Sequence, residues 1–296
     1  MRFWFMGKQQ TLLTLRLLLI GFLAHGIGWS QTDKISFEPE DQDIFKQIIY
    51  ELPPEESIEI GQAVAATGKL LLNTPYEAGT LEIENQERLI VNLRGLDCTT
   101  FVENALAIGG MARNGQKDWD TYLKHLEQLR YRDGILMGYP SRLHYFTDWI
   151  RNNSEKGLVL DITEGLGGLP VQKKINFMGS HPELYPALAS EKNLERIREH
   201  EAELSAEDFF VLPAESVSKV EDQIRDGDII ALATSVEGLD VTHTGLALRK
   251  ADGRIHLLHA STRGAVEVSK VPLSDYLKGI KGNTGIIVIR PLDFQE

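Results

Sequence analysis

The sequence predicts an α+β protein in which a helix packs against an antiparallel sheet. From Cys98 onward, apolar residues follow helical spacing. These positions are Phe101, Val102, Ala105, Leu106, Ile108 and Ala112. The C-terminal third instead alternates short apolar runs with Gly and Asp turns, which predicts strands at 229–233, 241–248, 255–260 and 286–289. With 296 residues, 42% hydrophobic and 25% charged, we expect one elaborated globular domain at 31–296.

Residues 1–30 differ in kind from the rest of the chain. Arg2 and Lys8 give a basic start, 17–24 is an apolar run, and Gly28 and Ser30 are small residues suited to cleavage after residue 30. This pattern predicts a signal peptide and a periplasmic or secreted mature protein. The apolar run is short for a membrane span, and an uncleaved anchor is the alternative. No later segment approaches spanning length, so we expect no stable membrane insertion after cleavage.

The charge balance restricts the partners. The formal net charge is −12, and removal of residues 1–30, which carry three basic residues and no acid, changes it to −15. Proteins that bind nucleic acids need a positive surface, so we expect no nucleic-acid partner. The same balance disfavours adhesion to anionic wall polymers and suits a small diffusing substrate.

Cys98 is the only cysteine, so no intrachain disulfide can form and one thiol faces an oxidising compartment. Asp97 is a good N-cap, which predicts Cys98 at the first helical position. There the helix dipole and free backbone N–H groups favour the thiolate and can stabilise an oxyanion. The alternative for a lone cysteine is a small buried hydrophobe. The position at a helix start favours a nucleophile.

A thiol nucleophile needs a base, and the chain has eight histidines. His25 falls in the predicted signal peptide. Three others lie in polar surroundings, where we expect them to be solvated: His125, His181 and His200. The remaining candidates are His144, His243, His256 and His259. His243 opens one predicted strand and His259 closes the next, which favours this pair.

The turn between these two strands decides whether their histidines meet. A three-residue loop ending at a left-handed Gly253 pairs Gly245 with His259. His243 then lies diagonally across on the same sheet face, about 7 to 8 Å from His259 at the backbone, and Gly245 leaves room for a ring. A two-residue loop would instead put the histidines on opposite faces. We expect the three-residue loop, with His256 on the other face.

Five segments carry a family resemblance. They are 73–82, 96–101, 139–145, 225–230 and the pair 243–248 with 258–260. The helix-start cysteine followed by two strand histidines resembles the NlpC-type branch of papain-like peptidoglycan hydrolases. Segments 73–82 and 139–145 make the chain more closely similar to the N-acetylmuramoyl-L-alanine amidase-like family within that branch. The likeness runs from Ile60 to Pro291.

The resemblance implies a papain-like core and a role for each site residue. Cys98 attacks, His243 is the base, His259 orients it, and Tyr76 helps to hold the oxyanion; no cofactor and no metal are implied. The stretch at about 113–221 is longer than an NlpC-type core needs, and we expect it to be an insertion of helices and loops between the nucleophile helix and the sheet.

This insertion is rich in aromatic residues and arginine. Aromatic faces and planar guanidinium donors suit sugar rings and carboxylate groups, which indicates a wall that recognises substrate. The candidate substrate contacts are Ser141, Arg142, His144 and Tyr145. A packed helical cap without substrate contacts is the alternative.

The expected function is hydrolysis of the amide between N-acetylmuramic acid and L-alanine in peptidoglycan-derived muropeptides. The nearest alternative is an endopeptidase of the same catalytic type that cuts between D-glutamate and the diamino acid. A non-catalytic muropeptide-binding protein is another. A zinc protein using Cys98, His243 and His259 is disfavoured because no close Cys or His pair has the usual metal-site spacing.

Overall fold

A computed structural model describes residues 34–52, 58–82 and 86–294, so the predicted signal peptide lies outside the described residues. Within these ranges an eight-stranded antiparallel sheet has the order β4-β5-β10-β6-β7-β8-β9, with β3 also paired to β10. Its strands are β3 (Val159–Asp161), β4 (Leu169–Val171), β5 (Phe209–Pro213), β6 (Ile229–Thr234), β7 (Val241–Arg249), β8 (Ile255–Ala260), β9 (Val266–Val268) and β10 (Asn283–Pro291). A short parallel pair, β1 (Ile35–Ser36) and β2 (Leu89–Ile90), lies apart from it.

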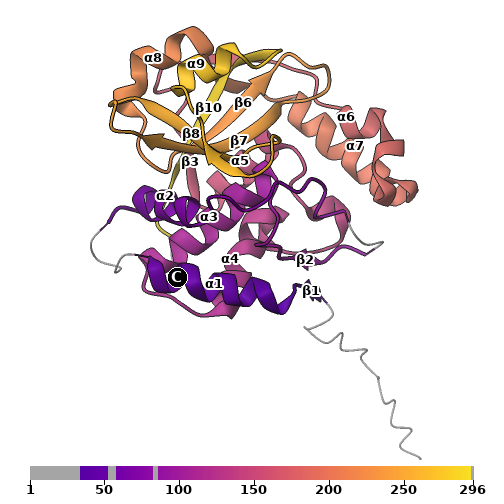
Figure 1. Cartoon of the computed structure of the whole chain (residues 1–296). Helices are drawn as coiled ribbons and strands as arrows, with labels where there is room; N and C mark the ends of the chain where they lie inside the picture. The colour runs from indigo at the N-terminus through magenta and orange to yellow at the C-terminus, as the bar shows by residue number, and fades with distance from the viewer. Residues whose placement is uncertain (1–33, 53–57, 83–85, 295–296) are drawn as a thin grey trace, which may run out of the picture.

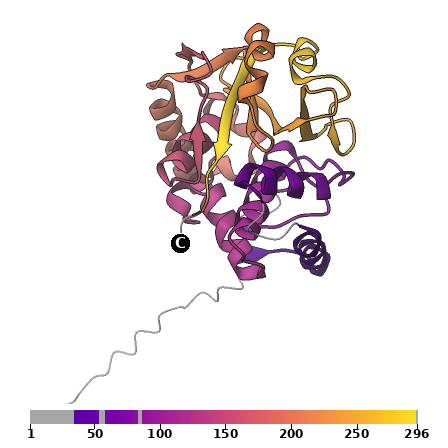
Figure 2. The same ribbon diagram turned by 90° about the vertical axis from the view of Figure 1, so that its left-hand side faces the viewer.

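Helices lie on both faces of the sheet. The α-helices of the described residues are α1 (Pro39–Glu51), α2 (Ile60–Leu70), α3 (Cys98–Arg113), α4 (Trp119–Arg130), α5 (Phe146–Glu155), α6 (Phe177–Ser180), α7 (Glu191–Ser205), α8 (Val217–Val220) and α9 (Leu273–Lys278). Figure 1 shows α2 and α3 below the sheet, α8 and α9 above it, and α6 with α7 to one side. Figure 2 shows β10 running the length of the sheet. The predicted α+β class with an antiparallel sheet is confirmed. None of the described helices is long and apolar enough to span a membrane.

Strand alternation divides the interior into two layers. Ile229 and Ala231 of β6 belong to the apolar cluster that contains α3, whereas Ile230 and Leu232 belong to the cluster that contains Leu273 of α9. Successive side chains of a strand point to opposite faces, so a strand covered on both sides is apolar throughout. All six residues of β6 are buried, as this arrangement requires.

The stretch at 113–221 differs in part from the expected insertion of helices and loops. It contains α4 to α8, but β3, β4 and β5 also come from it and extend the main sheet. Leu169–Val171 and Phe209–Pro213 are short strands that become regular only by pairing with each other and with β10. Short apolar runs such as these do not reveal their type without their partners.

Candidate active site

The helix that begins at Cys98 is capped as the sequence predicts. Helix α3 begins at Cys98, and the Asp97 carboxylate accepts a hydrogen bond of 2.7 Å from the Thr100 N–H. Further along α3, the buried Glu103 accepts a 2.7 Å hydrogen bond from Arg130 Nε of α4. The N-terminal half of α3 is therefore fixed at its cap and again one turn later.

A second bond joins the start of α3 to the sheet. Thr244 Oγ1 of β7 donates to the Cys98 carbonyl oxygen at 2.8 Å. Because Thr244 follows His243 directly, this bond brings the helix start and the strand histidine together. Cys98 and His243 both line one cleft of about 260 Å³.

The β7–β8 hairpin has the predicted register. Leu246 pairs with Leu258, Gly253 is left-handed with φ of 79°, and a Cβ on Gly245 would lie 2.9 Å from the His259 Cβ. That distance is too short for any side chain other than hydrogen. His243 and His259 therefore lie on one face, and His243 Nε2 is 2.7 Å from His259 Nδ1 with the ring planes at 90°.

Burial keeps both imidazoles neutral near neutral pH. It lowers the pKa of His243 to about 4, against an opposing contribution from the Asp97 charge. It lowers the pKa of His259 to about 3, and the charges of His243 and Arg263 lower it further. A neutral imidazole has one bare nitrogen and can accept a proton.

The pKa of Cys98 differs from the expectation of a thiolate stabilised by the helix start. Burial raises the pKa of its thiol and the Asp97 charge raises it further, while hydrogen bonds from Thr244 and Thr99 oppose this in part. Loss of hydration thus outweighs the donors around the sulfur. The raised pKa favours the protonated thiol over the thiolate near neutral pH.

Tyr76 lies in a loop that runs beside the segment leading into Cys98, where it forms a β-bridge with Leu96. Its N–H donates to the Gly264 carbonyl at 2.8 Å, and the next residue, Glu77, donates its N–H to the Leu96 carbonyl at 3.1 Å. Burial raises the pKa of Tyr76, and the nearby Cys98 and Asp97 raise it further. The phenol is therefore protonated and can donate a hydrogen bond.

Two of the four predicted substrate contacts line the Cys98 cleft. These are His144 and Tyr145. His144 Nε2 donates to the Tyr139 carbonyl at 2.9 Å. The Tyr145 hydroxyl donates to Glu201 of α7 at 2.7 Å and accepts from the Met178 N–H at 2.9 Å. The Tyr145 hydroxyl and His144 Nε2 therefore already have protein partners.

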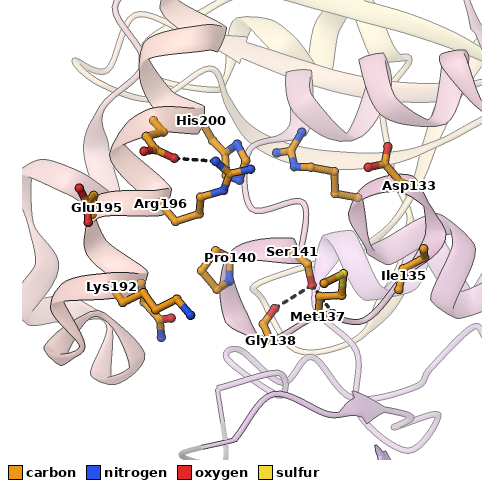
Figure 3. Close-up of a pocket in the computed structure, with 13 residues that line it drawn as sticks. Asp133, Ile135, Met137, Gly138, Pro140, Ser141, Lys192, Glu195, Arg196 and His200 are labelled. Carbon is orange, nitrogen blue, oxygen red and sulfur yellow. Dashed lines mark hydrogen bonds and ion pairs between the residues drawn. The ribbon is translucent and has the colours of Figure 1, made fainter.

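The other two predicted contacts, Arg142 and Ser141, do not line this cleft. The side chain of Arg142 is 6% exposed and forms ion pairs with Glu82 and Glu87. Ser141 lines a separate pocket of about 530 Å³ between the 132–141 segment and α7, as Figure 3 shows.

The cleft also contains residues that the sequence did not single out. They are Glu82, Thr99, Leu143, Phe146, Met178, Tyr185, Leu239, Asp240, Val241, Thr242 and Thr244. Thr99 and Thr244 are direct neighbours of the predicted nucleophile and base, which could have indicated them. Met178 and Tyr185 come from the distant 113–221 stretch and give no local signal. The expected solvation of His125 and His200 is wrong, since both are buried.

Within the described ranges, no three His, Cys, Asp or Glu side chains gather closely enough to share a metal ion. The cleft side chains with reactive chemistry are instead the thiol and imidazole groups described above.

The family model for N-acetylmuramoyl-L-alanine amidase-like proteins matches residues 66–286. The chain belongs to this family. An N-acetylmuramoyl-L-alanine amidase from Bacteroides uniformis ATCC 8492 is 39% identical, covers 79% of this chain and 99% of its own, and superposes with a TM-score of 0.74. A Bacteroides fragilis protein, provisionally described as a xylanase, is 41% identical over 75% of this chain and 98% of its own, with a TM-score of 0.71.

A Legionella pneumophila protein shares the fold. It is 20% identical, with a TM-score of 0.64, and covers 86% of this chain and 95% of its own. No curated protein matches the sequence.

Proposed function

We propose that this family member is an exported cysteine amidase that cleaves the bond between N-acetylmuramic acid and L-alanine in muropeptides. The observation that carries this proposal is that His243, which lines the same cleft as Cys98, has its Nε2 2.7 Å from Nδ1 of the buried His259. A helix-start thiol, a base and an orienting residue in that order also support a papain-like, NlpC-type core.

The acylation step uses the neutral pair. Because Nε2 of His243 is bonded to His259, its Nδ1 is the nitrogen left to take the thiol proton. The Cys98 sulfur attacks the lactyl carbonyl carbon as that proton moves to His243, and the imidazolium then protonates the alanine nitrogen. The C–N bond breaks, the peptide leaves as an amine, and a thioester remains on Cys98.

Deacylation returns the site to its starting state. His243 takes a proton from water, and the hydroxide attacks the thioester carbonyl. The C–S bond then breaks, His243 returns its proton to the sulfur, and the muramic acid leaves as a carboxylic acid that loses its proton to solvent. In both steps the oxyanion is stabilised by the N–H groups of Cys98 and Thr99, the first two of α3, and by the Tyr76 hydroxyl.

The family and the Bacteroides uniformis amidase support the choice of this bond. The cleft supports thiol chemistry over glycoside hydrolysis. Glycosidases generally need two carboxyl groups facing the scissile bond. The acids that line this cleft are Glu82, which pairs with Arg142, and Asp240, which accepts two hydrogen bonds from Thr147.

The test is digestion of a defined disaccharide-tetrapeptide by the mature protein, followed by mass spectrometry, with Cys98→Ala as the control. Free disaccharide and tetrapeptide are the expected products. Cleavage inside the peptide would assign the endopeptidase activity instead, separated sugars would assign a glycosidase, and binding without turnover would assign a muropeptide-binding protein. Export is tested by locating the mature N-terminus, which we expect at residue 31 in the periplasm or medium.

A further inference from the structure

His259 has one buried nitrogen without a hydrogen-bond partner. The residue is 2% exposed, and its Nδ1 contacts His243, but its Nε2 forms no hydrogen bond within the described chain. Buried polar atoms in folded proteins are nearly always paired, because an unpaired one loses its hydration without compensation. This nitrogen therefore calls for a physical explanation.

The proposed mechanism fixes the hydrogen positions, and the present inference rests on it at this point. A neutral imidazole carries one hydrogen. His243 can accept the thiol proton at Nδ1 only if its own hydrogen is on Nε2, where it donates to His259 Nδ1. His259 must then carry its hydrogen on Nε2. The productive arrangement leaves a buried N–H donor on the side of His259 that faces away from His243.

Tyr276 of α9 packs against this imidazole. The ring centroids are 5.4 Å apart and the ring planes meet at 67°, an edge-to-face contact. Tyr276 packs on the apolar cluster that contains Leu257, and alternation along β8 puts His259 on the same sheet face as Leu257. The face of an aromatic ring is negative, so it attracts an N–H and repels a bare nitrogen lone pair.

No charged neighbour in the described chain is hydrogen-bonded to this nitrogen. Glu267 lies directly opposite His259 in the β8–β9 register but forms no hydrogen bond with it, and the nearby Arg263 has only donors. The Tyr276 ring, which packs edge-to-face with this imidazole, is thus a neighbour that can favour one neutral form of His259 over the other.

We propose that Tyr276 is a positioning residue whose ring holds His259 in the Nε2–H form and so keeps His243 Nδ1 free to take the thiol proton. The hydroxyl has no part in this role. Tyr276→Phe keeps the ring face. Tyr276→Leu removes the ring and admits water, which can accept from an N–H or donate to a bare nitrogen and so favours neither form of His259.

The test measures the imidazole ¹⁵N shifts of the resting full-length protein near neutral pH, in parallel with muropeptide kinetics. In the parent and in Tyr276→Phe we expect His259 with hydrogen on Nε2 and a bare Nδ1. In Tyr276→Leu we expect a mixture of the two forms and a kcat about two- to fivefold lower at unchanged KM, in keeping with a weak N–H to ring contact. Leu277→Ala, on the same short helix and buried in the same cluster, is the matched control for loss of α9 packing and should leave the shifts unchanged.

Two results would overturn the inference: hydrogen on His259 Nδ1 in the parent, or unchanged ¹⁵N shifts in folded Tyr276→Leu. A Phe variant as impaired as the Leu variant would also overturn it, because the hydroxyl would then be the important group. The NMR readout needs no substrate. If the shifts behave as expected and the parent cleaves no muropeptide, the proposed function alone fails.

Discussion

Polar side chains have different partners in two regions of the molecule. One region is the junction of α3, β7 and β8, and the other is the stretch between α3 and β6. At the junction, residues that short sequence patterns single out contact each other, as His243 contacts His259. In the longer stretch, Arg142 instead reaches back to Glu82 and Glu87, and Tyr145 reaches Glu201. A segment rich in aromatic residues and arginine can therefore use these side chains for contacts within the protein as readily as for contacts with substrate.

The largest expected effect lies at the junction. Cys98→Ala should lower turnover by more than about a thousandfold, because the attacking group is lost, and should leave thermal unfolding unchanged. Since burial raises the pKa of this thiol, alkylation of the parent should be slow near neutral pH and should reach half its limiting rate above the usual thiol range. Turnover by Cys98→Ala above about one thousandth of the parent rate would exclude a covalent thioester. Rapid alkylation near neutral pH would restore the original expectation of a helix-start thiolate.

The next largest losses of activity should come from the two histidines, with His243 more important than His259. His243→Ala should lower kcat by about 100- to 10,000-fold, the usual contribution of a general base, whereas His259→Ala should leave partial activity because His259 only orients its neighbour. Steady-state kinetics on one muropeptide checks both. The opposite order would exchange the roles, and full activity in both variants would make His144, which also lines the cleft, the next base to test.

In the stretch between α3 and β6, loss of an arginine should lower the stability of the protein rather than its affinity for substrate. Arg142→Met leaves the buried Glu87 carboxylate without its ion-pair partner, with only the Tyr131 hydroxyl bonded to it within the described residues, and should lower the free energy of unfolding by about 3–5 kcal/mol in urea titrations. Arg151→Met, whose side chain is 26% exposed and whose partner Asp148 also pairs with Arg132, should cost clearly less. A higher KM at undiminished stability would instead make Arg142 a substrate contact.

The histidine pair should also make stability depend on pH. Folding lowers the pKa of His243 to about 4 and that of His259 to about 3, from 6.5 for each unperturbed group. The unfolded chain therefore binds more protons in this window, so stability is fully present above pH 6.5 and falls as the pH drops towards these values. Urea unfolding at several pH values should show a shallower fall in His259→Gln than in the parent. Identical slopes would mean that His259 is not buried in its neutral form.

The smallest effect is expected at Ser141. Its hydroxyl donates to the Gly138 carbonyl at 2.7 Å and accepts from the Met137 N–H at 2.9 Å, so Ser141→Ala should cost about 1 kcal/mol of stability. Muropeptide kinetics should be unchanged, because Ser141 lines the pocket of Figure 3 rather than the Cys98 cleft. A changed KM would connect that pocket to substrate binding and weaken the contrast between the two regions.

The sequence by itself determined the features that depend on neighbours along the chain. The Asp97 cap, the helix start at Cys98 and the β7–β8 register follow from capping, periodicity and one turn, each decided within about ten residues. These features carry the catalytic proposal, and the sheet class follows from the same periodicities.

Only the tertiary structure decided what depends on distant partners. It joined β3, β4 and β5 to the sheet, paired Arg142 with Glu82 and Glu87, and placed Cys98 in a partly buried position where loss of hydration raises the pKa of its thiol. It also placed Tyr276 against His259. Hydration and ion pairing depend on every group packed around a side chain, and most of those groups lie tens of residues away in the sequence.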